Sequence, residues 1–169
     1  MSQLSIPSFD SPLMLRDSRG RYRQASADQI LEAARQVIDQ KMQRGDEFTS
    51  PAAVKDYLRA KLAGFEQEVF AVLFLDTCHR LIDYAEMFRG TIDSAEVHPR
   101  EVVKEALRLN AAAVIISHNN PSGNPEPSAA DRALTSQLRQ ALALVDVRTL
   151  DHIIVAGGTT TSFAERGLI

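Results

Sequence analysis

The chain has 169 residues, a formal net charge of −3, and 44% hydrophobic and 24% charged residues. This length suits one domain with a sizeable core, and the composition is that of a globular protein rather than a disordered chain. The net negative charge and the scattered Lys and Arg residues argue against a domain whose main task is to bind phosphate backbones.

The single cysteine, Cys78, excludes an intrachain disulfide and is typical of a reducing compartment. No apolar stretch approaches the ~20 residues that span a bilayer. The first five residues lack the charged segment followed by an apolar run that opens a secretory signal. We therefore expect a cytoplasmic protein with no membrane partner.

Residues 1–25 are polar and irregular, which predicts an extended arm with a turn at Ser18-Arg19-Gly20. A capping box at 26–29 then opens an amphipathic helix, and Gly45 is expected to end it. The sequence thus predicts an N-terminal arm and helix over residues 1–47.

The main domain is expected over residues 48–169, and it opens with a helix capped by Ser50-Pro51. Residues 69–75 form an apolar, β-favouring run followed by a turn and a returning strand, which predicts an antiparallel hairpin. The remaining predicted elements are a helix at 100–110, a buried strand at 111–117, a polar loop at 118–127, a helix capped by Ser128 and a strand at 153–156. This order predicts an α/β fold with a mixed central sheet flanked by helices.

Four polar residues gather where the second buried strand ends. His118 leaves the strand, and Asn120 points the same way if the chain stays extended. Ser128 and Asp131 lie one turn apart at the start of the next helix. Because a strand end that faces a helix N-terminus is a common place for a polar site, we expect these residues to form one.

The spacing is His-x-Asn-x7-Ser-x2-Asp. With a histidine at position 120 it would be the signature of the JAMM (MPN) zinc metalloproteases, and the chain most resembles their RadC branch. The blocks that carry this resemblance are 88–92, 97–103, 111–119 with Pro121-Ser122-Gly123, and 151–155. The chain is similar to the short RadC type, which lacks an extra N-terminal helical domain. The resemblance implies a cytidine-deaminase-like architecture.

The resemblance also implies roles for individual residues. His118 and Asp131 would be zinc ligands, with water in the open position that catalytic zinc requires. Ser128 would hold the oxyanion formed when water attacks a carbonyl. A glutamate on the strand before Gly90 would act as general base and then acid, and Glu86 is the candidate. Zinc would be the cofactor, and a protein or peptide the substrate.

Two positions depart from the family pattern. Asn120 stands where the second histidine ligand is expected, and its neutral amide oxygen is a weak donor for zinc. We expect this change to lower zinc affinity by several kcal/mol, out of the ~10–16 kcal/mol of structural sites.

Many relatives have their glutamate starting where this chain has Ala85. A shift of one residue reverses the face of a strand and a bulge restores it, so Glu86 points either toward the metal or away from it.

Three functions remain open from the sequence. The first is a zinc-dependent hydrolase of peptide or isopeptide bonds with an impaired metal site, and the second is an inactive MPN interaction module. The third is a DNA-associated factor, because RadC proteins usually carry a DNA-repair label. The acidic composition does not support nucleic-acid binding, which would need a local basic surface such as Arg100, Lys104 and Arg108.

For His152, at a strand start, we expect a structural role.

Overall fold

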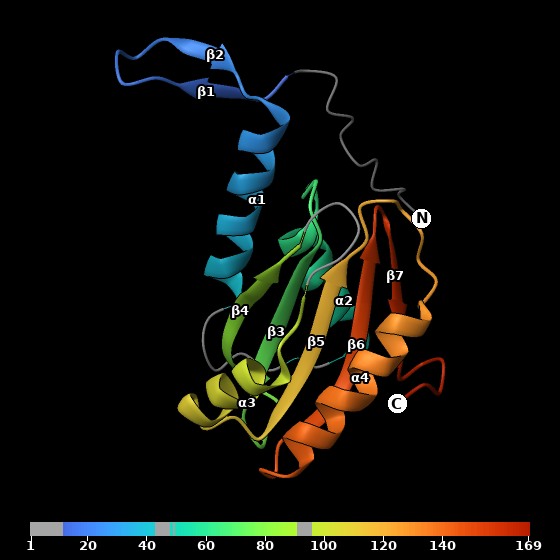
Figure 1. The fold of residues 1–169 in the computed structure, drawn as a ribbon. Helices are drawn as coiled ribbons and strands as arrows, with labels where there is room; N and C mark the ends of the chain where they lie inside the picture. Colours follow the sequence, from blue (N-terminus) through green and yellow to red (C-terminus); the bar gives the residue numbers. More distant parts are fainter. Residues whose placement is uncertain (1–11, 43–47, 49, 91–95) are drawn as a thin grey trace, which may run out of the picture.

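The computed structural model describes residues 12–42, 48, 50–90 and 96–169. Its centre is a five-stranded sheet in the order β4-β3-β5-β6-β7, in which only β5 and β6 are parallel (Figure 1). The strands are β3 (Val69–Leu75), β4 (Leu81–Arg89), β5 (Ala113–Asn119), β6 (Arg148–Ala156) and β7 (Thr159–Ser162). The predicted mixed α/β fold is confirmed.

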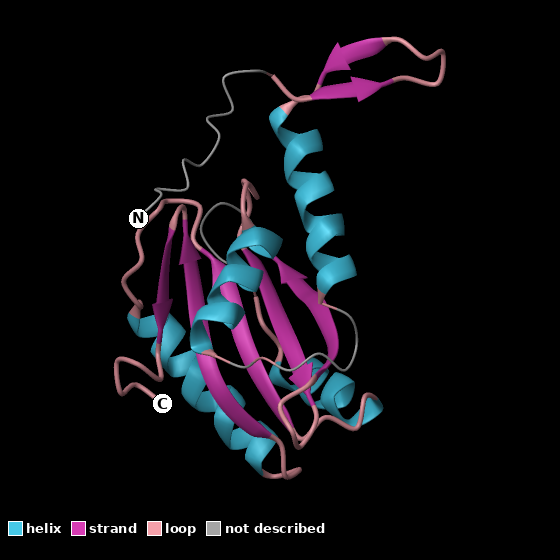
Figure 2. Cartoon of the chain, turned by 180° about the vertical axis from the view of Figure 1, so that it is seen from behind, coloured by secondary structure: helices cyan, strands magenta, loops and turns pink. Residues whose placement is uncertain are grey.

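Helices cover both faces of the sheet, as the two opposite views show (Figures 1 and 2). Helix α2 (Pro51–Leu62) covers one face, and α3 (Pro99–Arg108) and α4 (Ala129–Ala143) cover the other. All residues of β3 and β5 are therefore buried, which explains why β3 and the first four residues of β5 are continuous apolar runs rather than alternating ones. We call the two sides the α2 face and the α4 face.

A bulge in β4 decides which side chains reach each face. Phe70 pairs with Phe88 and Ala71 pairs with Glu86, so Met87 is an extra residue between these two pairs. A bulge of this kind lets neighbouring positions on one strand share a face. Ala85, Met87 and Phe88 accordingly all pack against the core on the α4 face.

The N-terminal segment stands apart from the sheet. Strands β1 (Met14–Arg16) and β2 (Tyr22–Gln24) form a hairpin, and α1 (Ala27–Lys41) joins it to the body (Figure 1). The predicted turn lies in this hairpin and the predicted capping box opens α1. Helix α1 packs against α2 but has no buried residue.

The predicted helix end at Gly45 lies outside the described residues. Among the residues that are described, no helix is both long and apolar enough to cross a membrane.

Candidate metal and hydrolytic site

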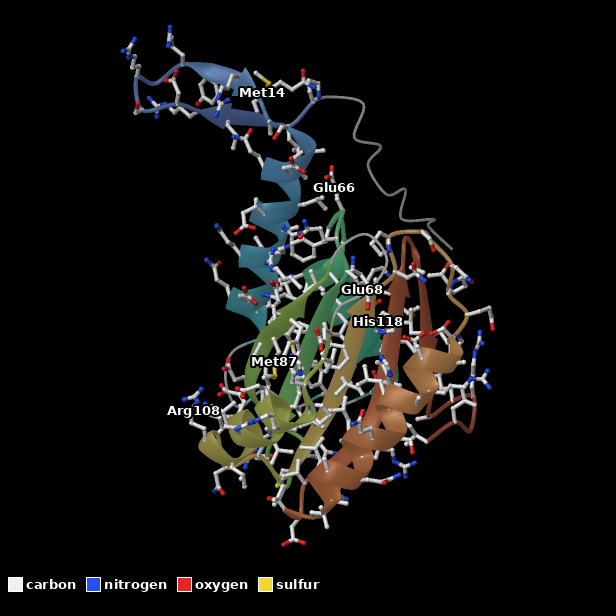
Figure 3. All side chains as sticks on the ribbon, in the orientation of Figure 1. Met14, Glu66, Glu68, Met87, Arg108 and His118 are labelled. Atoms are coloured by element: carbon white, nitrogen blue, oxygen red, sulfur yellow. The ribbon has the colours of Figure 1, made fainter. Side chains whose placement is uncertain are left out.

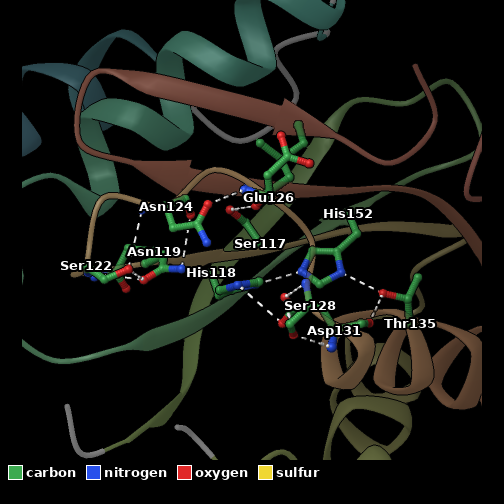
Figure 4. Close-up of polar contacts among 12 residues, drawn as sticks. Ser117, His118, Asn119, Ser122, Asn124, Glu126, Ser128, Asp131, Thr135 and His152 are labelled. Atoms are coloured by element: carbon green, nitrogen blue, oxygen red, sulfur yellow. Dashed lines mark hydrogen bonds and ion pairs between the residues drawn. The ribbon is translucent and has the colours of Figure 1, made fainter. Parts of the chain in front are cut away.

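The end of β5 meets the N-terminus of α4, and this junction brings His118 and Asp131 together (Figure 4). Ser128 is the N-cap of α4, and its hydroxyl accepts a hydrogen bond from the backbone N–H of Asp131 at 3.0 Å. In return, Oδ2 of Asp131 accepts from the Ser128 backbone N–H at 2.8 Å and from its hydroxyl at 2.7 Å. This capping box leaves Oδ1 of Asp131 directed at His118 Nε2, 3.5 Å away.

A chain of hydrogen bonds behind His118 fixes its tautomer. The Thr135 hydroxyl donates its hydrogen to the Asp131 backbone carbonyl at 2.6 Å, so it must accept from Nδ1 of His152, also at 2.6 Å. Nε2 of a neutral His152 then has no hydrogen and accepts from Nδ1 of His118 at 2.8 Å. The lone pair of His118 Nε2 is therefore directed at Asp131.

The electrostatics keep both imidazoles neutral. Burial lowers the pKa of His118, and the negative charge of Asp131 opposes this shift only in part. The pKa of His152 is lowered further, because burial and the neighbouring His118 both disfavour its charged form. His118 Nε2 and Asp131 Oδ1 are thus two acceptors that face each other with no hydrogen between them.

This pair has the geometry of two ligands of one cation. Zinc binds histidine nitrogen and carboxylate oxygen at about 2.0–2.1 Å, and in a tetrahedral site two such atoms lie about 3.3 Å apart. The observed separation is 3.5 Å. Catalytic zinc has three protein ligands, however, and no group of three His, Cys, Asp or Glu side chains suited to a metal occurs in the part of the chain that the structure describes.

The side chain of Asn120 does not supply the third ligand. Its Oδ1 accepts hydrogen bonds from the backbone N–H and the hydroxyl of Ser122, at 3.1 and 2.7 Å. Its Nδ2 donates to the Asn124 carbonyl at 3.0 Å. The amide is therefore used to close the turn after β5, and the residues present fit a two-ligand cation site rather than a catalytic zinc.

Glu86 lies on the wrong face of the sheet for the predicted general base. Directly paired residues of neighbouring strands carry their side chains on the same face. Phe70 pairs with His118 on the α4 face, whereas Ala71, which pairs with Glu86, lies on the α2 face. The position on the His118 side is Ala85, so the geometry argues against Glu86 as the base.

The contacts of Glu86 agree with this placement. Its carboxylate accepts a hydrogen bond from Arg89 at 2.6 Å and a long one, 3.4 Å, from the hydroxyl of Tyr84. Tyr84 packs against the core on the α2 face. The extra residue Met87 follows Glu86 in β4, so the bulge changes the face only of the side chains that come after Glu86. Glu86 itself stays on the α2 face.

Another carboxylate, Glu68, lies at the same end of the sheet as His118 (Figure 3). Phe70 pairs with His118 in antiparallel strands, and carrying this register two residues past that last observed pair sets Glu68, which precedes β3, opposite Asn120. Side chains alternate along an extended chain, which places Glu68 on the face of Phe70. The side chain is half-buried. The sequence shows Glu68 directly before an apolar strand, but only the register of β3 against β5 identifies it as a site residue.

Asn119 holds the backbone on both sides of Glu68. Its Oδ1 accepts from the Val69 backbone N–H at 2.7 Å, and its Nδ2 donates to the Gln67 carbonyl at 3.0 Å. Asn119 is buried, with a relative exposure of 4%. These two bonds tie the residue before Glu68 and the residue after it to the end of β5, next to His118.

Ser128 and His152 both contact the predicted ligands. The Ser128 hydroxyl donates to Asp131, so its oxyanion role stays a prediction. His152 is fully buried at the centre of β6, where it orients His118, and sequence reasoning missed this connection. The missing signal is spatial, because the two histidines are 34 residues apart.

A mixed sheet covered on both faces, with a histidine and an aspartate converging where β5 meets α4, defines a domain of the JAB (MPN) class. Residues 48–168 match the RadC-like JAB domain family. A UPF0758 protein of Vibrio cholerae serotype O1 is 55% identical over 152 residues, covering 88% of this chain and 96% of that protein. A UPF0758 protein of Thioalkalivibrio sulfidiphilus is 50% identical over 167 residues, covering 99% and 73%. The chain belongs to the RadC-like JAB domain family.

Proposed function

We propose that this chain is a zinc-hydrolase-type JAB domain for peptide or isopeptide bonds, in which hydrolysis is impaired at position 120. Such a domain binds its substrate with little or no turnover. One observation carries this proposal: His118 Nε2 and Asp131 Oδ1 converge to 3.5 Å, while the Asn120 amide is turned into the following loop.

Apart from position 120, the groups that a zinc hydrolase needs are present around His118 and Asp131, and they support the assignment to a hydrolase-type site. Glu68 is a carboxylate on the correct face to accept a proton from a water molecule near His118. His152 and Thr135 fix the His118 imidazole so that its lone pair faces Asp131. The capping box fixes the Asp131 carboxylate. The supporting groups are present, and the departure lies in one ligand position.

A pocket beside position 120 lies on the α2 face, because Leu62 and Val155 line it, and so on the side of the sheet opposite His118 and Asp131. Its volume is about 330 Å³. The lining is mostly apolar and includes Phe65 and Val155, with the polar side chains of Asn119 and Asn120 among its residues. Because it lies on the other face of the sheet, this pocket is not a substrate site for His118 and Asp131 and gives no support to a peptide substrate.

The basic face considered for nucleic acid on α3 has a net charge of only +1, from three cations and two glutamates. Arg100 and Lys104 both lie near Glu101, at 3.8 and 3.9 Å, and Arg108 pairs with Glu105 at 2.5 Å. These two acidic partners offset most of the positive charge of the helix face. The α3 surface therefore gives no support to a DNA-associated function.

The substitution Asn120→His tests the proposal. With three strong ligands, we expect zinc to bind near one equivalent, and its affinity to rise at least about 100-fold, because each ligand contributes several kcal/mol. Gln140→His, on the exposed side of α4, adds a histidine elsewhere and should leave zinc binding at the wild-type level. Zinc would be measured by elemental analysis and chelator competition, and hydrolysis with a quenched-fluorescence peptide library.

Two results would contradict the proposal. If Asn120→His takes up no more zinc than Gln140→His, the segment is not a metal site. If the wild-type chain already binds one zinc tightly and cleaves peptides as fast as Asn120→His, position 120 is not a defect.

A further inference from the structure

The β1–β2 hairpin carries a concentration of positive charge that the composition conceals. Residues 12–25 contain four arginines and one aspartate, a net charge of +3, although the whole chain carries −3. The rest of the chain therefore carries −6. The arginines alternate with other residues rather than forming a run, so the sequence shows them as scattered, and the hairpin gathers them.

These arginines are exposed and largely unneutralised. Arg16, Arg19, Arg21 and Arg23 are all exposed. Arg21 pairs with Asp17 at 3.2 Å, and no ion pair of the other three exists within the described residues. This contrasts with the cations of α3, each of which lies near a glutamate. The hairpin is thus the local basic surface that the α3 face fails to provide.

The register distributes the cations over the whole ribbon. Arg16 pairs with Tyr22 on one face, and Arg23 pairs with Leu15 on the other. Arg19 lies in the turn between the strands. A ribbon with positive charge on both faces and at its tip matches a groove that has phosphates along both walls.

The placement of the hairpin leaves it free to enter such a groove. It lies at the end of α1 that is farther from the sheet, and both views show it projecting from the body (Figures 1 and 2). The major groove of B-DNA is about 12 Å wide and admits a two-stranded β-ribbon. Guanidinium groups bind phosphate oxygens in two-point contacts. Tyr22, which is 68% exposed, adds an aromatic ring beside Arg16.

We propose that the β1–β2 hairpin binds double-stranded DNA through its phosphates, as a ribbon in the major groove. This contact is separate from the His118 and Asp131 site and does not depend on hydrolysis. Affinity should be modest and salt-dependent. Three phosphate contacts, from Arg16, Arg19 and Arg23, predict a slope of log K against log[salt] near −2.7, which is roughly a 40-fold loss between 50 and 200 mM salt.

The test is fluorescence anisotropy of the full chain with a labelled 20-base-pair duplex of mixed sequence, and with one of its single strands. The hairpin variant is Arg16→Gln/Arg19→Gln/Arg23→Gln, which keeps the Arg21–Asp17 pair. The matched control is Arg100→Gln/Lys104→Gln/Arg108→Gln, which removes the same charge from α3. Thermal unfolding and circular dichroism verify that both variants fold.

We expect the wild-type chain and the α3 variant to bind the duplex similarly, and the hairpin variant to bind at least about 10-fold more weakly, with a salt slope smaller by roughly 3. The proposal is overturned if the wild-type chain shows no duplex binding at 50 mM salt, if it binds only the single strand, or if both variants lose affinity equally. It is also overturned if the wild type self-associates through the hairpin, without binding DNA, and the hairpin variant becomes monomeric in sedimentation experiments.

Discussion

Nε2 of His118 and Oδ1 of Asp131 face each other at 3.5 Å, and the hydrogen-bond chain through His152 and Thr135 leaves no hydrogen between them. Two facing acceptors repel unless a cation lies between them. The surrounding bonds hold this arrangement in place, which is how second-layer contacts prepare a metal site.

The carboxylate that acts as base is expected to be Glu68. In the Asn120→His background, Glu68→Gln should lower kcat by about 100-fold or more while zinc content stays the same, because proton transfer is lost and the ligands remain. Glu86→Gln is the matched control. It removes only the exposed pair with Arg89, worth less than about 1 kcal/mol, and should leave kcat at the parent value.

Steady-state kinetics with the cleaved peptide, together with metal analysis of each variant, checks this assignment. The reverse pattern, in which Glu86→Gln abolishes turnover and Glu68→Gln does not, would show that the face assignment is wrong.

Thr135 is expected to stabilise the site through the hydrogen-bond chain. Thr135→Val removes the hydroxyl with little change in shape and leaves Nδ1 of His152 buried without its acceptor. This should lower the free energy of unfolding by about 1–3 kcal/mol. In the Asn120→His background it should also weaken zinc binding by about 10–100-fold, since His118 is then less well oriented.

Thr149→Val provides a matched control for Thr135→Val. The Thr149 hydroxyl is buried and is the one such side-chain atom without a hydrogen-bond partner in the described part of the chain. Its removal should be neutral or stabilising in urea denaturation, because no bond is lost and an unsatisfied group is removed. Equal losses in the two variants would mean that the hydrogen bonds of Thr135 contribute nothing specific.

Stability should fall as the pH drops through 6.5 in metal-free buffer. The folded-state pKa values of His118 and His152 are both lowered, so the unfolded chain binds protons at pH values where the folded chain does not. The contribution of the two neutral histidines to the free energy of unfolding is fully present above the unfolded pKa of about 6.5. It is lost on acidification, by up to about 1.4 kcal/mol per pH unit for each histidine.

Urea denaturation between pH 5.5 and 8, with chelator present, measures this slope. Histidine NMR signals of the folded protein provide the decisive check. The prediction fails if His118 and His152 titrate near 6.5 in the folded state.

Asn119 is expected to position Glu68 by fixing the strand entry. Asn119→Ala leaves the Val69 amide and the Gln67 carbonyl without their partner and should cost about 1–3 kcal/mol for each group that stays unsatisfied. Hydrogen exchange at the Val69 amide should become faster. Asn124→Ala, in the exposed part of the following loop, is the control. Unchanged exchange at Val69 in Asn119→Ala would exclude the positioning role.

The sequence by itself determined the order of the main elements and the polar segment at the end of β5. Apolar runs and helix caps are local signals, so β3, β5 and the capped start of α4 could be predicted from them. The spacing of His118, Ser128 and Asp131 also indicated which residues would meet, since a strand and the helix that follows it are joined by a short loop. The substitution at position 120 was visible for the same reason.

Only the tertiary structure decided which face each carboxylate occupies and where the charge gathers. The face of Glu86 depends on the register of β4 and on the bulge at Met87, and the place of Glu68 depends on the pairing of β3 with β5. The orientation of His118 depends on His152, which comes from another strand. These relationships join residues far apart in the chain, and spacing along the sequence contains no information about such pairings.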